Sequence, residues 1–135
     1  MTMDIDMNTV AGLVGECGRF PDAMEDGSGY YIAADGMISD GDIALYYEKL
    51  KYAAAHADSL IESGFDKEFF GFYGVDRGNA GSPEKMCAEL MFDSFVLVPE
   101  RKTVECCVSN PEFMPGHFIE YVWDYDWNLR SVRIN

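Results

Sequence analysis

This sequence contains little histidine, and it lacks the cysteine spacing that metal sites need. It has two histidines and four cysteines, and the cysteines do not stand at metal-binding spacings. Cys106 and Cys107 are adjacent, and adjacent strand residues point to opposite faces, so they are poor disulfide partners for each other. The glycines form no phosphate-binding loop between a strand and a lysine-bearing helix. The sequence therefore predicts no catalytic residues, no cofactor and no metal, and so a protein that is not an enzyme.

Positive charge is also scarce. The 135 residues include 24 acidic and 10 basic side chains, which give a formal net charge of -14. Affinity for nucleic acids and anionic membranes comes largely from Lys and Arg, so neither is an expected partner. Residues 1–6 lack the positive and apolar regions of a secretory signal, and no apolar stretch approaches the roughly 20 residues that span a membrane. We therefore expect a cytoplasmic protein.

Acidic side chains are concentrated in the first half of the chain. Residues 1–68 hold 14 acidic and 4 basic side chains, whereas the remainder holds 10 and 6, and no Lys or Arg occurs between Phe20 and Glu48. Carboxylates without nearby cations attract a basic protein, although a high net charge can also serve solubility alone. With an aromatic anchor at a turn added, the expected partner-binding residues are Asp22, Glu25, Asp26, Asp35, Asp40, Asp42 and Trp127.

The length and the 48% hydrophobic content suit a single domain over residues 1–135. A long helix is predicted over residues 42–63, where apolar side chains recur at helical spacing. Ser39 and Asp42 resemble a capping box at its start, and Gly64 would supply a left-handed stop at its end. Shorter helices are predicted over residues 9–15, capped by Asn8, and from residue 82 onward, where serine, proline and glutamate follow one another.

Strands are predicted where apolar side chains alternate or run together between turns. Turns are expected at 77–81 and 126–128, and the strand segments are 30–33, 65–76, 95–98, 103–109, 117–125 and 129–134. The last four would form an antiparallel meander. The predicted fold class is therefore α+β, with an antiparallel sheet of four or more strands and one long and one or two short helices packed on one face.

Two further motifs have ordinary structural interpretations. The segment 124–128 alternates oxygen-bearing side chains like a calcium loop, but Leu129 and Asn135 stand where such a loop needs glycine and a carboxylate. A hairpin turn is the better interpretation. Of the two histidines, His56 is expected to be exposed, and His117 is expected to bond to a loop.

Four aromatic side chains lie close to this turn. Tyr121, Trp123 and Tyr125 share one face of a predicted strand and are expected in the core. Trp127 stands at the turn itself, where glycine is commoner. Its ring would either anchor a partner or fold back over the edge of the sheet.

The order of elements from residue 82 onward is distinctive. A short helix opens at Ser82-Pro83-Glu84, strands follow at 95–98 and 103–108, and Pro115-Gly116 precedes a strand at 117–122. With the turn Asp124-x-Asp126-x-Asn128-Leu129, this pattern resembles small, acidic bacterial immunity proteins of polymorphic toxin systems, over residues 82–135. Trp127 departs from the glycine of that turn. The resemblance implies a protein that binds a cognate toxin, occludes its active site and catalyses nothing.

The leading hypothesis is a non-enzymatic immunity or inhibitor protein that neutralises a basic partner such as a bacterial toxin. The alternative is a type III secretion chaperone or another small acidic adaptor. Such a chaperone is expected to end in an amphipathic helix, whereas the last predicted element here is a strand. An enzyme would need a pocket that joins His117 to Cys106 or Cys107 and a carboxylate. The oligomeric state stays open.

Overall fold

The computed structural model describes residues 5–20, 27–64, 87–110 and 116–135. Within these ranges, five strands form one sheet in the order β1-β2-β3-β4-β5. Strands β2 to β5 pair antiparallel in succession, whereas β1 pairs with β2 in parallel at one edge. The strand bounds are Tyr30–Ile32 for β1, Met91–Val98 for β2, Thr103–Ser109 for β3, Ile119–Asp124 for β4 and Leu129–Ile134 for β5.

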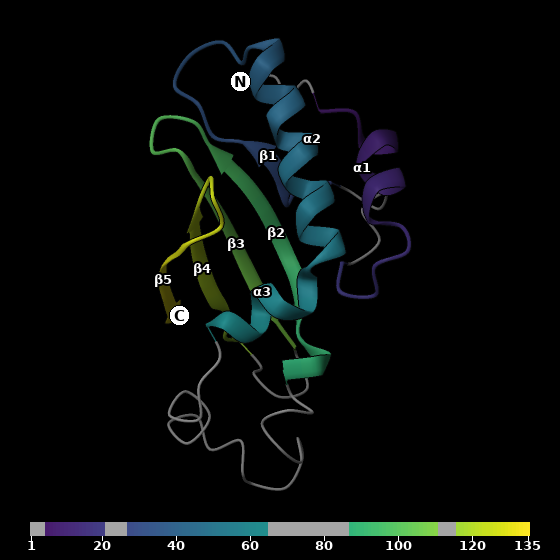
Figure 1. Ribbon diagram of the computed structural model, residues 1–135, viewed down its shortest axis with the longest axis vertical. Helices are drawn as coiled ribbons and strands as arrows, with labels where there is room; N and C mark the ends of the chain where they lie inside the picture. The colour runs from purple at the N-terminus through teal and green to yellow at the C-terminus, as the bar shows by residue number, and fades with distance from the viewer. Residues whose placement is uncertain (1–4, 21–26, 65–86, 111–115) are drawn as a thin grey trace, which may run out of the picture.

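The helices lie together against the sheet. Their bounds are Met7–Val14 for α1, Asp40–Ala55 for α2 and Ala57–Ser63 for α3. Helices α2 and α3 cover one face of the sheet, and α1 packs beside α2 (Figure 1). This arrangement confirms the predicted α+β fold with its C-terminal meander. In the part of the chain that the structure describes, no helix is long and apolar enough to span a membrane.

Side chains cap the first two helices. The hydroxyl of Ser39 accepts the backbone N–H of Asp42 at 3.1 Å, as the capping box predicts, and α2 begins at Asp40. Helix α1 is capped by Asp6, whereas Asn8 was predicted. One carboxylate oxygen of Asp6 accepts the N–H of Asn8 at 3.0 Å, and the other accepts the hydroxyl of Thr9 at 3.1 Å. The helix therefore begins two residues earlier than the sequence indicated.

The prediction of a single helix over 42–63 is wrong, because the helix is interrupted at His56. That residue has φ of -124° and ψ of 24°, outside the helical range, and it separates α2 from α3. Local bonds support the break: the ring Nδ1 bonds to the carbonyl of Tyr52 at 2.9 Å, and the hydroxyl of Ser59 donates to the carbonyl of His56 at 3.1 Å. The apolar spacing continues across the break, which is why the periodicity alone predicted one helix.

The end of α3 also differs from the expectation. Gly64 follows the helix as predicted, but its φ is -107°, so it supplies no left-handed stop. The need for glycine has another cause. A Cβ at this position would lie 2.6 Å from Cε2 of Tyr121, so a larger residue would displace that buried ring.

Large aromatic side chains join the helices to the sheet. Burial alternates residue by residue along β3 and β4, so every second side chain faces the helices. Two buried phenols also bond across the layers: Tyr46 donates to the carbonyl of Phe95 at 2.8 Å, and Tyr121 donates to that of Ile61 at 2.7 Å. Burial raises the pKa of both phenols above the ordinary range, so they remain protonated donors.

Some of the remaining secondary-structure predictions can be compared with the structure, and others fall outside the described residues. Strand β2 begins at Met91, four residues before the predicted strand over 95–98. Strands β1, β3 and β5 match their predicted segments within one residue, and β4 is shorter than predicted. The predicted strand over 65–76, the turn over 77–81 and the helix start at 82–84 lie outside the described residues.

Candidate protein-interaction surface

Three predicted acidic residues lie where β1 leads into α2. Asp35 and Asp40 are exposed, and Asp42 is half-buried in the first turn of α2. The backbone N–H of Asp35 donates to a carboxylate oxygen of Glu100 at 3.1 Å, which brings a fourth acid from the β2–β3 turn to this end of the molecule. Asp22, Glu25 and Asp26 lie outside the described residues.

We call the described residues 5–20 and 27–64, which include the three helices, the helical half. Two of its three described cations point inward. The guanidinium of Arg19 is 12% exposed, and its Nη2 lies 2.9 Å from a carboxylate oxygen of Asp58. Its Nη1 donates to the carbonyl oxygens of Cys87 at 2.8 Å and Leu90 at 3.2 Å. These bonds tie Arg19 to the segment before β2, and its ion pair compensates the exposed carboxylate of Asp58.

Lys49 is the second inward cation and is 9% exposed. Its Nζ donates to the carbonyl of Tyr125 at 2.5 Å and lies 5.4 Å and 5.9 Å from the ring centroids of Tyr125 and Trp127. Among the described cations of the helical half, only Lys51 is exposed. The exposed charged side chains of this half are therefore mostly acidic. Seven of its described acids are exposed: Asp6, Glu16, Asp35, Asp40, Glu48, Asp58 and Glu62.

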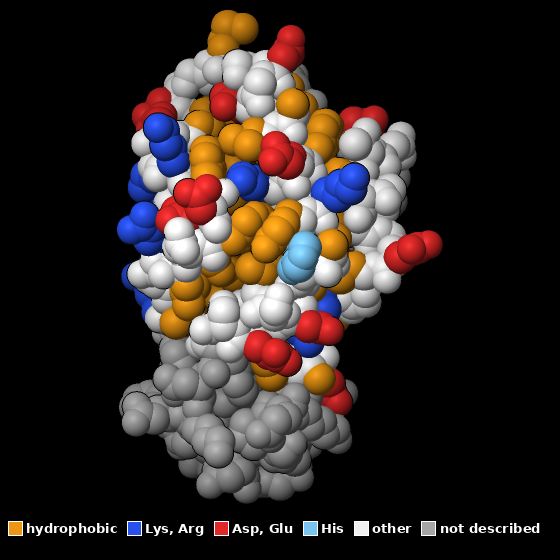
Figure 2. Space-filling view, viewed as in Figure 1, with side chains coloured by type: hydrophobic (Ala, Val, Ile, Leu, Met, Phe, Trp, Pro, Cys, Tyr) orange, Lys and Arg blue, Asp and Glu red, His pale blue; other side chains and the backbone are white. Residues whose placement is uncertain are grey.

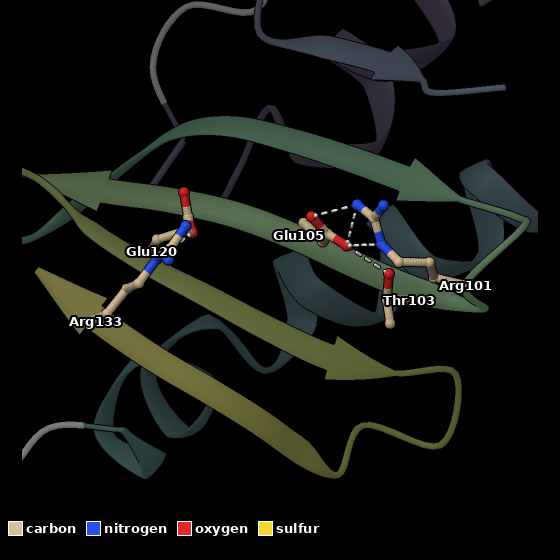
Figure 3. Close-up of polar contacts among 5 residues, drawn as sticks. All are labelled: Arg101, Thr103, Glu105, Glu120 and Arg133. Carbon is tan, nitrogen blue, oxygen red and sulfur yellow. Dashed lines mark hydrogen bonds and ion pairs between the residues drawn. The ribbon is translucent and has the colours of Figure 1, made fainter. Parts of the chain in front are cut away.

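Charges on the opposite face of the sheet are paired. Arg101 lies 2.9 Å from the carboxylate of Glu105, which also accepts the hydroxyl of Thr103 at 2.7 Å. Arg133 lies 2.7 Å from Glu120 on the neighbouring strand (Figure 3). Glu105 and Glu120 each have an arginine within ion-pair distance, so these two carboxylates contribute little net field. The described charges thus separate into a helical layer with seven exposed acids, of which Asp58 is paired with Arg19, and a sheet face on which Glu105 and Glu120 are each paired with an arginine.

Trp127 is not a free anchor at the tip of a turn. Its ring is half-buried and stacks on Tyr52 of α2, with centroids 4.8 Å apart and planes 16° apart. It also meets the buried Trp123 edge-on at 5.7 Å. Of the three residues predicted in the core, Tyr121 and Trp123 are buried, but Tyr125 is only half-buried. The β4–β5 turn therefore packs on α2, and it brings Trp127 to the same layer as the acids.

The turn itself is organised by Asp124. Its carboxylate accepts the backbone N–H groups of Asp126 and Asn128, each at 2.9 Å, and lies 3.0 Å from Arg130. These contacts, led by the bond from Asn128, lower the pKa of Asp124. The turn is thus stabilised while Asp124 is ionised, and this stabilisation is lost as the pH falls through its lowered pKa. The segment 124–128, with its alternating oxygen-bearing side chains, therefore forms a hairpin turn, as predicted.

The two adjacent cysteines that an enzyme could use lie on opposite faces of the sheet. Cys106 faces the core, whereas Cys107 lies half-buried on the open face of the sheet. Burial raises the pKa of both thiols, and the charge of Glu120 adds to the effect at Cys107. His117 Nδ1 bonds to the carbonyl of Asn135 at 3.0 Å. The arrangement disfavours a thiolate at either cysteine.

A hollow that the sequence did not indicate lies beside the α2–α3 break. It has a volume of about 510 Å³, and its walls include Cys17, Arg19, His56 and Asp58. These residues come from two segments about 40 positions apart, so no motif in the sequence could have joined them. His56 is exposed, as predicted, but its ring also stacks on Tyr52 with centroids 4.0 Å apart.

The four thiols are expected to react with a disulfide reagent at very different rates. Cys17 is half-buried beside the hollow, and we expect it to react first; Cys107 should follow more slowly. Burial raises the pKa of Cys87 to about 11, so that thiol, and the fully buried Cys106, should react only on unfolding. Stopped-flow absorbance at pH 7.5 would resolve the phases. Cys17→Ser should remove the fastest phase, and its persistence in that variant would contradict the assignment.

Comparison with models of known protein families, with curated proteins and with solved structures found no match to this chain.

Proposed function

We propose that this protein is a non-enzymatic inhibitor of the immunity type, which binds a basic protein partner through its acidic helical layer. The separation of charge carries the proposal. The exposed carboxylates of the helical half have few cations beside them: Lys49 points inward, and Arg19 is paired with one of them, Asp58. On the sheet face, Glu105 and Glu120 are paired. A field that is concentrated on one side steers and orients a partner. Solubility alone requires only net charge, and the charge need not lie on one side.

The partner class follows from the sign of this field. A protein that binds nucleic acid, such as a nuclease toxin, has a cationic surface for phosphates, and an acidic surface complements it. An inhibitor that covers that surface blocks the active site without any catalysis of its own. A toxin of this kind also explains why the inhibitor needs fast association, because free toxin damages the cell that makes it.

Depletion of the protein in its native host tests the proposal. We expect growth to stop, and we expect a second-site deletion of the gene for a basic protein to restore it. Expression of the wild-type chain should also restore growth, whereas a catalytically inactive toxin should make the protein dispensable. Normal growth after complete depletion, under conditions in which the candidate toxin is expressed and active, would refute an immunity role.

A further inference from the structure

Three aromatic rings form a continuous stack on the surface of the helical layer. Tyr52 lies between the other two, with centroids 4.0 Å from His56 and 4.8 Å from Trp127. We call Tyr52, His56 and Trp127 the aromatic patch. Tyr52 is 39% exposed, although most large apolar side chains of the described residues are buried. Figure 2 shows apolar side chains at the centre of this face, with both acidic and basic side chains around them.

The backbone at Trp127 departs from what a turn prefers. Its φ is 67°, in the left-handed region, where a residue with a side chain costs about 1 kcal/mol or more relative to glycine. Asp124 fixes the turn, and Lys49 binds it to α2. Glycine would close the same turn without strain, so the indole must make contacts that offset the cost of the left-handed backbone. The indole packs on Trp123 and on Tyr52, and these contacts offset the cost.

Exposed carboxylates stand next to two residues of the aromatic patch. Glu48 is exposed one helical turn before Tyr52, and Asp126 is exposed next to Trp127. Of the cations near the patch, Lys49 is buried and donates to the carbonyl of Tyr125, whereas Lys51 is exposed next to Tyr52 in the sequence. An aromatic centre with an acidic border is complementary to a cation that is flat and weakly hydrated.

We infer that the aromatic patch, with Glu48 and Asp126, binds an arginine side chain of the basic partner. This inference rests on the proposed function and names the side chain that the partner contributes. A guanidinium packs against aromatic surface and donates in pairs to carboxylates, whereas an ammonium holds its water more tightly and donates from a point. Buried Trp and Tyr side chains that meet an arginine are also typical centres of a protein interface.

Two peptides of equal charge, hexa-arginine and hexa-lysine, test the inference. NMR titration at low ionic strength would measure both affinities, and the chain has only two indole N–H signals, from Trp123 and Trp127. We expect hexa-arginine to bind about two- to fivefold more tightly, the ratio that corresponds to one exposed contact between a cation and an aromatic ring. Signals of Tyr52 and Trp127 should shift more with hexa-arginine.

A pair of matched variants distinguishes the patch from general acidity. Tyr52→Leu keeps apolar bulk but removes the ring, and Tyr31→Leu makes the same change at a residue of β1 that is 38% exposed. We expect Tyr52→Leu to abolish the preference for hexa-arginine while hexa-lysine binds as before, and Tyr31→Leu to change neither. Equal binding of both peptides to the wild type would overturn the arginine site and leave the proposed function standing. Failure of either peptide to bind at low salt would overturn both.

Discussion

Reversing two exposed charges in Asp35→Lys/Asp40→Lys is expected to slow association with the basic partner by about tenfold or more at low ionic strength. Both residues are exposed between β1 and the first turn of α2, at the end of the acidic layer where Glu100 also lies. Long-range attraction acts before contact, so the association rate should fall far more than the dissociation rate rises. Stopped-flow fluorescence at several salt concentrations would measure both rates, and the salt dependence of association should also decrease.

A control variant with the same change in net charge distinguishes the effect of where the charge lies from the effect of how much charge there is. Glu105→Lys/Glu120→Lys reverses two carboxylates on the sheet face, where each is paired with an arginine. We expect it to change the association rate much less, and to cost little stability because such exposed pairs contribute about 1 kcal/mol or less. Circular dichroism would confirm that both variants fold. If the two variants slowed association equally, net charge alone would explain the attraction, and the acidic layer would have no directing role.

Sheet structure was largely predictable because burial in strands has a period of two. Residues of β3 and β4 alternate between core and open face, and the sequence shows this alternation directly. The interruption at His56 was not predictable from periodicity, because apolar residues continue at helical spacing on both sides of it. It depends on bonds from side chains to the backbone. The parallel pairing of β1 with β2 joins segments about 65 residues apart, which local patterns do not encode.

The acidic stretch was visible in the sequence, but the orientation of the cations was not. Lys49 carried one signal: it lies three positions after the buried Tyr46 and four before the buried Ala53, on the same side of α2. Arg19 carried none, since its carbonyl partners lie about 70 residues away. Trp127 was correctly located at a turn, and only the folded chain shows that its ring stacks on Tyr52. The charge separation is therefore a property of the tertiary structure.

Replacing Arg19 by methionine is expected to lower the free energy of unfolding by about 2–3 kcal/mol. The guanidinium donates to the carbonyl oxygens of Cys87 and Leu90, two buried residues just before β2. Methionine keeps an apolar stem of similar length but cannot donate, so both carbonyls lose a charged donor. The loss of the Asp58 pair adds little, because that carboxylate is mostly exposed. Equilibrium unfolding in urea, followed by tryptophan fluorescence, would measure the change.

Arg101→Met is the matched control for this prediction. Arg101 also forms a short ion pair, with Glu105, but its side chain is 64% exposed and its bonds go to a solvated carboxylate. We expect a change in the free energy of unfolding of about 1 kcal/mol or less. Similar effects of the two substitutions would show that the inward guanidinium contributes no more than a surface pair does. The larger cost at Arg19 would mean that its inward orientation stabilises the fold, and that the same contacts remove a positive charge from the acidic surface.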